Sequence, residues 1–138
     1  MKIVREYRWE MGHRLPFHDG GCRNLHGHSY KTIIEMEGEA DKNGIVIDFY
    51  LLDAIMKPII AELDHGFLVW KEDKELIDVL DHIKSKMVIV DFQSTAENIC
   101  NYFMDKIRNS ELPKNITTVK CKLYETLDCF VEDEIKLI

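Results

Sequence analysis

A thiol and two imidazoles stand within seven positions of the stretch CRNLHGHSYK, residues 22–31. His26 and His28 are two residues apart, so on a β-strand both side chains project from the same side. His13 shares the parity of the apolar residues in an alternating run upstream, which predicts that its imidazole lies on the same buried sheet face. Buried imidazoles need partners, because a polar group removed from water without a hydrogen bond costs about 1–3 kcal/mol. A bound cation would meet that need.

Three neutral imidazoles from one rigid hairpin form an arrangement found in catalytic zinc sites, where a fourth position stays open for water or substrate. Nitrogen ligands favour zinc over magnesium or calcium, which prefer oxygen. We therefore predict that His13, His26 and His28 bind Zn²⁺; the alternative is that backbone or carboxylate partners satisfy them. Cys22 could close the site as a fourth ligand, or stand beside the metal as a thiolate that moves a proton. The sequence leaves both roles of the cysteine open.

Two further features could do acid–base or binding chemistry. Asp64 and His65 end a predicted helix, where the negative end of the helix dipole favours a protonated histidine, although a solvated helix end explains the bare dipeptide as well. Glu125 shares the parity of three apolar residues that should be buried (Val119, Cys121 and Leu123). A buried carboxylate is either paired with a cation or waits for a ligand that offers hydrogen-bond donors.

The elements that must position these groups follow from periodicity. Residues 3–13 and 26–36 alternate apolar with charged side chains, which predicts neighbouring antiparallel strands. Apolar residues recur every four positions in 50–66, which predicts an amphipathic helix with Asp48 as N-cap and Gly66 as a left-handed C-cap. The stretch STAEN predicts a second long helix that begins at Ser94 with a capping box.

Three shorter stretches complete the expected order of elements. We expect a short helix near 74–80, a strand at 87–92, and a C-terminal hairpin from about 119 that turns at residues 127 and 128. The order of elements predicts one α+β domain over residues 1–138, with an antiparallel four-stranded sheet and two long helices packed on one face.

Composition excludes several classes of protein. The chain has 138 residues, 46% of them hydrophobic, and a formal net charge of −7 without a block of Lys and Arg, so nucleic acid is not an expected partner. No apolar run approaches the roughly 20 residues that span a bilayer, so we expect no membrane contact. The N-terminus lacks the apolar stretch of a secretory signal, which predicts a cytoplasmic protein with four reduced cysteines.

Six segments together resemble the 6-pyruvoyltetrahydropterin synthase and 6-carboxytetrahydropterin synthase superfamily over nearly the whole chain. They are WEMGHRL at 9–15, the C-x3-HGH run at 22–28, GIVIDF at 44–49, LDH at 63–65, STAEN at 94–98 and YET at 124–126. The spacing of cysteine and HGH resembles the carboxy branch of the superfamily. One departure is that LDHGFLVW lacks the polar residues typical after LDH, which puts local loop contacts in doubt.

The resemblance implies a tunnelling fold, in which sheets of several subunits join into a barrel with active sites at subunit interfaces. It implies zinc on His13, His26 and His28, Cys22 as the proton-transferring thiol, and Asp64 with His65 as relay partners from a neighbouring chain. Glu125 and Thr95 would bind the pterin. A carboxylate suits this task, because it can accept two parallel N–H bonds from an amino-pyrimidinone edge.

The implied reaction converts 7,8-dihydroneopterin triphosphate to 6-carboxy-5,6,7,8-tetrahydropterin, acetaldehyde and triphosphate, on the route to queuosine and other deazapurines. The implied assembly is a homo-oligomer, a trimer or a hexamer. Two alternatives stay open: a pyruvoyl-type triphosphate lyase with the same metal site, and a non-catalytic module in which Cys22 completes a closed structural zinc site.

Overall fold

The first two strands form the long hairpin that the alternation predicts. In a computed structural model that describes residues 1–137, β1 spans Lys2–His13 and β2 spans His26–Gly38. They pair antiparallel, so that His13 lies opposite His26 and Met11 lies opposite His28. The apolar parity of both strands is buried, as predicted, and includes Trp9 and Tyr30, which are 3% and 1% exposed.

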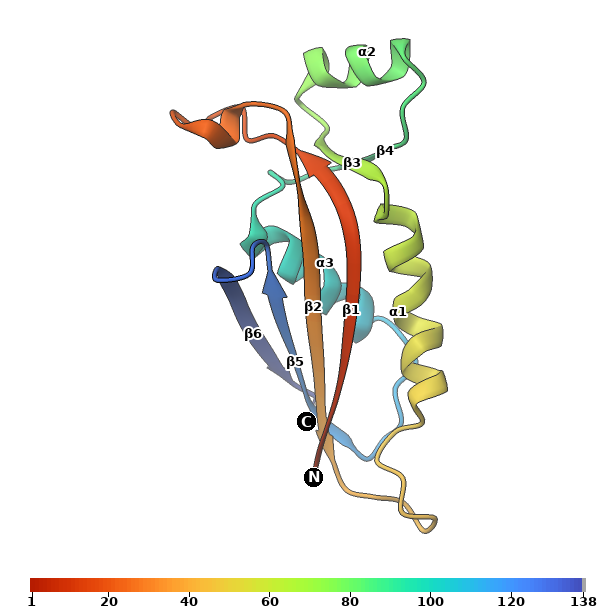
Figure 1. The fold of residues 1–138 in the computed structure, drawn as a ribbon. Coiled ribbons are helices and arrows are strands. Elements are labelled where there is room, and N and C mark those ends of the chain that lie inside the picture. Colours follow the sequence, from red (N-terminus) through yellow and green to blue (C-terminus); the bar gives the residue numbers. More distant parts are fainter. Residues whose placement is uncertain (138) are drawn as a thin grey trace.

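Four more strands extend the sheet on both sides of this hairpin (Figure 1). The strand β5 (Ile116–Tyr124) pairs antiparallel with β2, and β6 (Phe130–Lys136) pairs antiparallel with β5. On the other side, β3 (Gly66–Trp70) pairs parallel with β1, and β4 (Met87–Val90) pairs parallel with β3. The predicted four-stranded antiparallel sheet is therefore wrong in detail. The observed sheet has six strands in the order β4-β3-β1-β2-β5-β6, and it is mixed because β3 pairs parallel with β1 and with β4.

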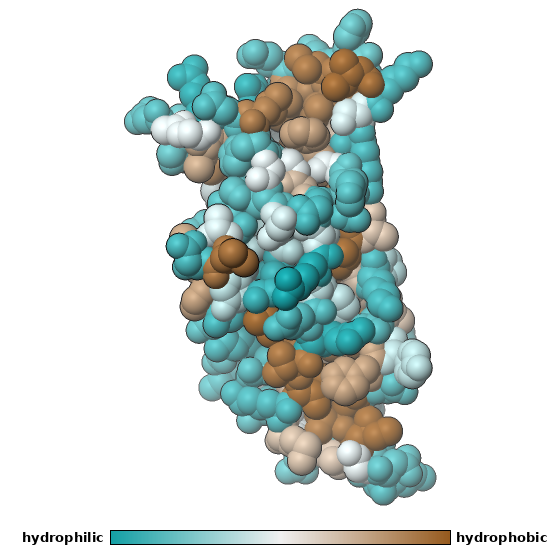
Figure 2. Space-filling view, viewed as in Figure 1, coloured by the Kyte–Doolittle hydropathy of each residue, from teal (hydrophilic) through white to brown (hydrophobic). Residues whose placement is uncertain are grey.

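Two long helices cover one face of the sheet, as the α+β prediction requires. The helix α1 spans Phe49–Leu63 and is capped by Asp48, whose side chain accepts the Tyr50 N–H. The helix α3 spans Ala96–Arg108 and carries three fully buried apolar residues, Ile99, Phe103 and Ile107. The buried faces of both helices join the apolar strand residues in one core. The opposite sheet face is mostly hydrophilic, while apolar residues gather at the two ends of the molecule (Figure 2).

Two predicted helix caps are wrong, and both errors concern the site. Gly66 does not end α1; it begins β3, and His65 takes the left-handed conformation instead, with φ of 58°. Ser94 does not cap α3, because Thr95 accepts the Asn98 N–H at 3.2 Å. The short predicted helix is present as α2 (Lys74–His82), in an excursion between β3 and β4. No helix in the described part of the chain is long and apolar enough to cross a membrane.

Candidate metal and catalytic site

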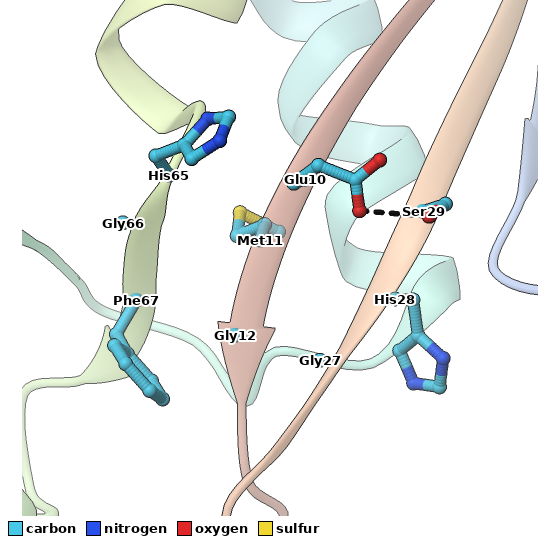
Figure 3. A pocket seen from close by; sticks show the side chains of 9 residues that line it. All are labelled: Glu10, Met11, Gly12, Gly27, His28, Ser29, His65, Gly66 and Phe67. Carbon is cyan, nitrogen blue, oxygen red and sulfur yellow. Dashed lines mark hydrogen bonds between the residues drawn. The ribbon is translucent and has the colours of Figure 1, made fainter.

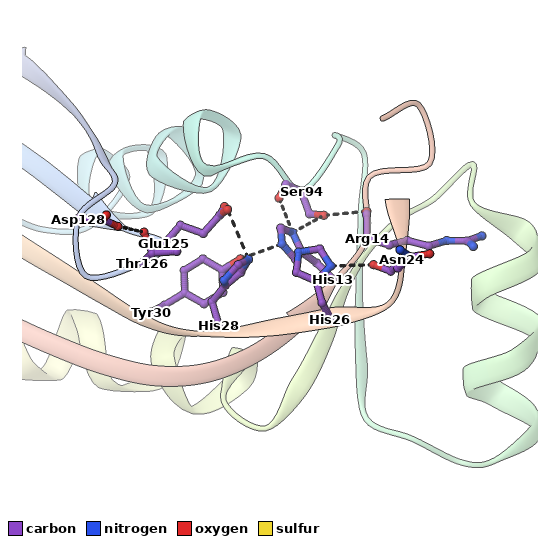
Figure 4. Close-up of polar contacts among 10 residues, drawn as sticks. All are labelled: His13, Arg14, Asn24, His26, His28, Tyr30, Ser94, Glu125, Thr126 and Asp128. Carbon is purple, nitrogen blue, oxygen red and sulfur yellow. Dashed lines mark hydrogen bonds and ion pairs between the residues drawn. The ribbon is translucent and has the colours of Figure 1, made fainter. Parts of the chain in front are cut away.

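Three imidazoles converge at the end of the β1–β2 hairpin (Figure 4). The ring of His13 lies 4.6 Å from that of His26 and 5.2 Å from that of His28, and the latter two rings are 4.9 Å apart, measured between centroids. One nitrogen from each ring lies within 4.8 Å of the other two. The alternation of two strands therefore brings together three side chains from positions 13 to 28, as predicted.

In two of the rings, those of His13 and His26, a hydrogen bond to a backbone carbonyl determines which nitrogen is free. The Nδ1 of His13 lies 2.8 Å from the carbonyl oxygen of Ser94, and the Nδ1 of His26 lies 2.7 Å from that of Asn24. Because a carbonyl only accepts, Nδ1 carries the hydrogen in each neutral ring and Nε2 keeps a lone pair. Metal-binding histidines are commonly oriented by such a bond from the second nitrogen.

The donor set fits a transition-metal ion. The Nε2 atoms of His26 and His28 are buried without a hydrogen-bond partner. Burial lowers the pKa of His13 to about 4 and also lowers the pKa of His28, so both rings favour the neutral form that a metal requires. Three imidazole nitrogens within 4.8 Å of one another suit zinc, copper, iron or nickel better than magnesium or calcium.

A carboxylate and a phenol border this cluster. The Oε1 of Glu125 lies 3.4 Å from the Nε2 of His28, and the hydroxyl of Tyr30 lies 3.4 Å from the Nε2 of His13. Burial, followed by the negative charges of Glu125 and Cys22, raises the pKa of Tyr30 well above its ordinary value. Glu125 is half-buried on the side of β5 that the parity predicts.

Cys22 lies in a single turn of 3-10 helix, Gly21–Arg23, four residues before His26. Its carbonyl accepts the backbone N–H of Leu15 at 2.8 Å, which closes the loop between β1 and β2. The thiol is half-buried, and it is absent from the group of metal-binding atoms that lie within 4.8 Å of one another in residues 1–137. This placement favours a thiol beside the cluster over a fourth ligand.

Asp64 and His65 directly precede β3, across β1 from the strand that carries His26 and His28. His65 and His28 both line a depression of about 310 Å³ (Figure 3). One oxygen of Asp64 accepts the Glu10 backbone N–H at 2.9 Å, and the other lies 3.0 Å from the Nδ1 of His65. The His65 backbone N–H in turn donates to the Glu10 carbonyl at 2.7 Å. The pair is thus held rigidly, but within one chain it does not join the three imidazoles.

The histidine side chain of this pair is open to solvent, with 77% of its surface exposed. Thr95, the other predicted pterin ligand, is half-buried, and its hydroxyl oxygen caps α3. No sequence pattern predicted the contacts that Ser94, Asn24 and Tyr30 make with the imidazoles. The position of Tyr30 could have been predicted, because it is two residues from His28 on the same strand and so lies on the same face. The contacts of the Ser94 and Asn24 carbonyls could not, because every residue type has a backbone carbonyl.

Comparisons with known proteins agree with this picture. The family model described as 6-pyruvoyl tetrahydropterin synthase matches residues 2–134. A protein of Haemophilus influenzae named 6-carboxy-5,6,7,8-tetrahydropterin synthase is 34% identical over 139 residues, covering 95% of this chain and 96% of its own length. The protein of the same name from Aquifex aeolicus is 31% identical, covering 91% and 92%.

Solved structures share the fold. The crystal structure of 6-pyruvoyl tetrahydropterin synthase from Plasmodium vivax has a TM-score of 0.80 at 19% identity, covering 99% of this chain and 98% of that one. An uncharacterized protein from Wolinella succinogenes has a TM-score of 0.78 at 21% identity, with coverages of 100% and 98%. At these identities the likeness concerns the fold alone.

Proposed function

The chain belongs to the 6-pyruvoyl tetrahydropterin synthase family, and from this premise we propose that it is a 6-carboxy-5,6,7,8-tetrahydropterin synthase. The substrate would be 7,8-dihydroneopterin triphosphate, and the products 6-carboxytetrahydropterin, acetaldehyde and triphosphate, in the biosynthesis of queuosine and related deazapurines. The observation that carries the proposal is the cluster of three imidazoles, with Cys22 four residues before His26 in the chain and outside the cluster. Relatives with the carboxy name at 31–34% identity favour this product over a pyruvoyl one.

Zinc is the metal we propose for His13, His26 and His28. When bound, it would supply Lewis acidity toward side-chain oxygens of the substrate. The protein's part is to hold the three rings neutral and aimed at one point, which the Ser94 and Asn24 carbonyls support for two of them.

Cys22 is the proposed base that removes a carbon-bound proton from the substrate side chain. A thiol can do so as the thiolate, and a position beside the metal site leaves its sulfur free for this task. Asp64 and His65 are the proposed relay that stores or returns protons. The hydrogen bond between Asp64 and Nδ1 leaves the Nε2 of His65 free to exchange a proton.

Glu125 is the proposed anchor of the pterin. Its carboxylate lies next to His28 and could accept two parallel N–H bonds from the amino-pyrimidinone edge, as it would from a guanidinium. Thr95 is proposed as a second contact, since it follows Ser94, which touches His13.

We also propose that the active unit is a homo-oligomer with sites shared between subunits. The support is that Asp64 and His65 are not among the groups that cluster with the three imidazoles in residues 1–137, and that the His65 side chain is exposed where a second copy could meet it.

Incubation with 7,8-dihydroneopterin triphosphate tests the proposal directly. The expected products are acetaldehyde and 6-carboxytetrahydropterin in equal amounts, identified by mass spectrometry after trapping of the aldehyde. Formation of 6-pyruvoyltetrahydropterin without acetaldehyde would assign the chain to the pyruvoyl reaction. Recovery of unchanged substrate with a fully metal-loaded protein would favour the structural zinc module.

A further inference from the structure

The hydrophilic face of the sheet follows a simple rule of charge pairing. Lys2 lies 2.9 Å from Glu35, and Lys120 lies 3.2 Å from Glu132, so cations on neighbouring strands face carboxylates. Such opposite-charge pairs stabilise a sheet, whereas like charges directly opposite each other destabilise it. The face therefore carries charge in a largely balanced form.

One row of this face breaks the rule. Arg8 of β1 and Lys31 of β2 are directly opposite each other in the strand register. Arg8 has Glu6 at 3.6 Å as its ion-pair partner, but no carboxylate in residues 1–137 lies within ion-pair distance of the half-buried Lys31. Two cations directly opposite each other destabilise the strand pair, and a bound anion would offset this effect.

Aromatic rings contact the ammonium groups of Lys31 and of the nearby Lys122. The Nζ of Lys31 lies 4.3 Å from the ring centre of Tyr124, and the Nζ of Lys122 lies 5.4 Å from the same ring and 3.9 Å from that of Phe130. A cation above a ring face is attracted to it, so these contacts orient the lysines without neutralising them. The row thus presents positive charge that is positioned and still available.

A cavity of about 300 Å³ lies over this row. Its lining includes Arg8, Lys31 and Tyr124, together with the hydroxyl-bearing Ser29 and Thr126. Glu10 also lines it, but the Glu10 carboxylate accepts the Ser29 hydroxyl hydrogen at 2.7 Å. The hydroxyl hydrogens of Ser29 and Thr126 are both donated within the chain, to Glu10 and Asp128, so the cations are the groups left to bind the oxygens of a polyphosphate.

The cavity lies beside the end of the β2–β5 pairing, next to the residues of β2 that carry the proposed metal ligands. Pairing between β2 and β5 stops at Lys31 and Tyr124, so β2 residues 26–30 have no partner on that side. Glu125, the next residue after Tyr124, points to the opposite face of the sheet beside His28. A ligand held at Glu125 could therefore pass this edge and place its far end over Lys31.

From these contacts we infer that Arg8 and Lys31, with Lys122 beside them, form a binding site for a polyphosphate chain. Under the proposed function, on which this assignment of the natural ligand rests, the site holds the triphosphate of the pterin substrate. The site itself is defined by the two cations, the Tyr124 ring and the cavity above them.

Titration calorimetry with inorganic tripolyphosphate tests the inference, on the protein as purified and with its metal content measured before and after. Arg8→Gln and Lys31→Gln should each weaken binding by about tenfold, since each removes a charge-assisted contact. A Lys2→Gln/Lys120→Gln double variant removes two charges from the same face and should bind within about twofold of the parent. The KM for the triphosphate substrate should rise in the first two variants and stay unchanged in the control.

Three results would overturn the inference: no measurable tripolyphosphate binding, an equal loss in the control variant, or a change of subunit number in Arg8→Gln and Lys31→Gln by ultracentrifugation. The last result would assign the cations to an interface between copies. Failure of the proposed function has a different signature, because tripolyphosphate binding would then still depend on Arg8 and Lys31 although no acetaldehyde forms.

Discussion

The chemistry of single residues at this site depends on hydrogen-bond direction. The carbonyls of Ser94 and Asn24 accept Nδ1–H from His13 and His26, so both rings present Nε2 lone pairs. Burial keeps the His13 ring neutral at physiological pH, because its pKa falls to about 4. Cys22, in contrast, is held through its backbone carbonyl, and within residues 1–137 its sulfur makes no hydrogen bond.

Replacement of Cys22 should separate metal binding from turnover. Cys22→Ala is expected to keep one metal ion per chain and to lose at least about a thousandfold in turnover, since a positioned acid–base group contributes about 10²–10⁴-fold. His26→Ala is the contrasting variant and should lose the metal, because one of three ligands is gone. Atomic emission spectrometry of the purified variants, with product assays in parallel, checks both expectations; loss of metal in Cys22→Ala would make the thiol a ligand.

Glu125→Gln tests the pterin anchor. The amide keeps one acceptor oxygen but turns an N–H toward the ligand, so pterin binding should weaken by about thirtyfold, equivalent to about 2 kcal/mol. Metal content should stay unchanged, because three imidazoles remain. Glu111→Gln, at an exposed position beyond α3, is the matched control. Fluorescence titration with a pterin measures the affinity, and equal affinities for the two variants would remove the anchor role.

Side-chain parity explains which site residues the sequence could predict. His13, His26 and His28 were placed on one face because strand alternation determines which side each residue points to. Ser94 was predicted as a helix cap, but Thr95 serves equally well one position later, which frees Ser94 to contact His13. Residue types cannot distinguish these two registers, because both residues carry a hydroxyl that can cap a helix.

At the scale of elements, the excursion that contains α2 is tied to the end of β1 by one ion pair. The guanidinium of Arg14 binds both oxygens of Asp73, with Nε at 2.7 Å, and Asp73 also caps α2 through the Leu76 N–H. Arg14 directly follows His13, so this ion pair connects the cluster of three imidazoles to α2. Hydrogen bonds from Arg14 hold the pKa of Asp73 below its ordinary value of 3.8.

The pH dependence of this ion pair can be predicted in sign. Because the pKa of Asp73 is lower in the folded state, its stabilising effect is complete above about pH 5 and is lost as the pH falls below about 4. Asp73→Asn keeps the shape and the cap but loses the charge, so it should cost about 2 kcal/mol of unfolding free energy at pH 7. Urea unfolding from pH 7 to pH 3 should show this difference shrinking; Asp91→Asn, an exposed aspartate after β4, should show none.

The elements that the sequence predicted well are those with strong periodicity. One face of each of these elements is buried in the core, and the other faces solvent: this holds for the β1–β2 hairpin, α1 and α3. Their apolar residues therefore recur with a clear strand or helix period. The strand β3 was missed because it has five residues, follows a helix directly and is buried or half-buried throughout, which removes the alternation. Because β3 was not predicted, its parallel pairing with β1 was not predicted either. That pairing positions Asp64 and His65, which directly precede β3, next to Glu10 of β1.

At the scale of the whole molecule, the groups proposed for proton transfer are divided. Cys22 lies in the loop between β1 and β2, whereas Asp64 and His65 directly precede β3, which pairs with the other edge of β1. His65 is held in a left-handed conformation that is rare for residues other than glycine, and its ring is largely exposed. Backbone strain of this kind often marks a functional position. A second copy that brings its Cys22 to this ring would complete the site.

Mixed oligomers test this arrangement. Cys22→Ala and His65→Ala should each be nearly inactive alone. Coexpressed with different affinity tags and purified on both, they should recover about one quarter to one third of the parental activity, because random assembly of mixed closed oligomers restores that share of two-residue sites. Cys22→Ala coexpressed with His26→Ala is the control, since both residues belong to the same half of the site and no intact pair can form. Activity in a dilute monomer, or recovery in neither mixture, would place the whole site within one chain.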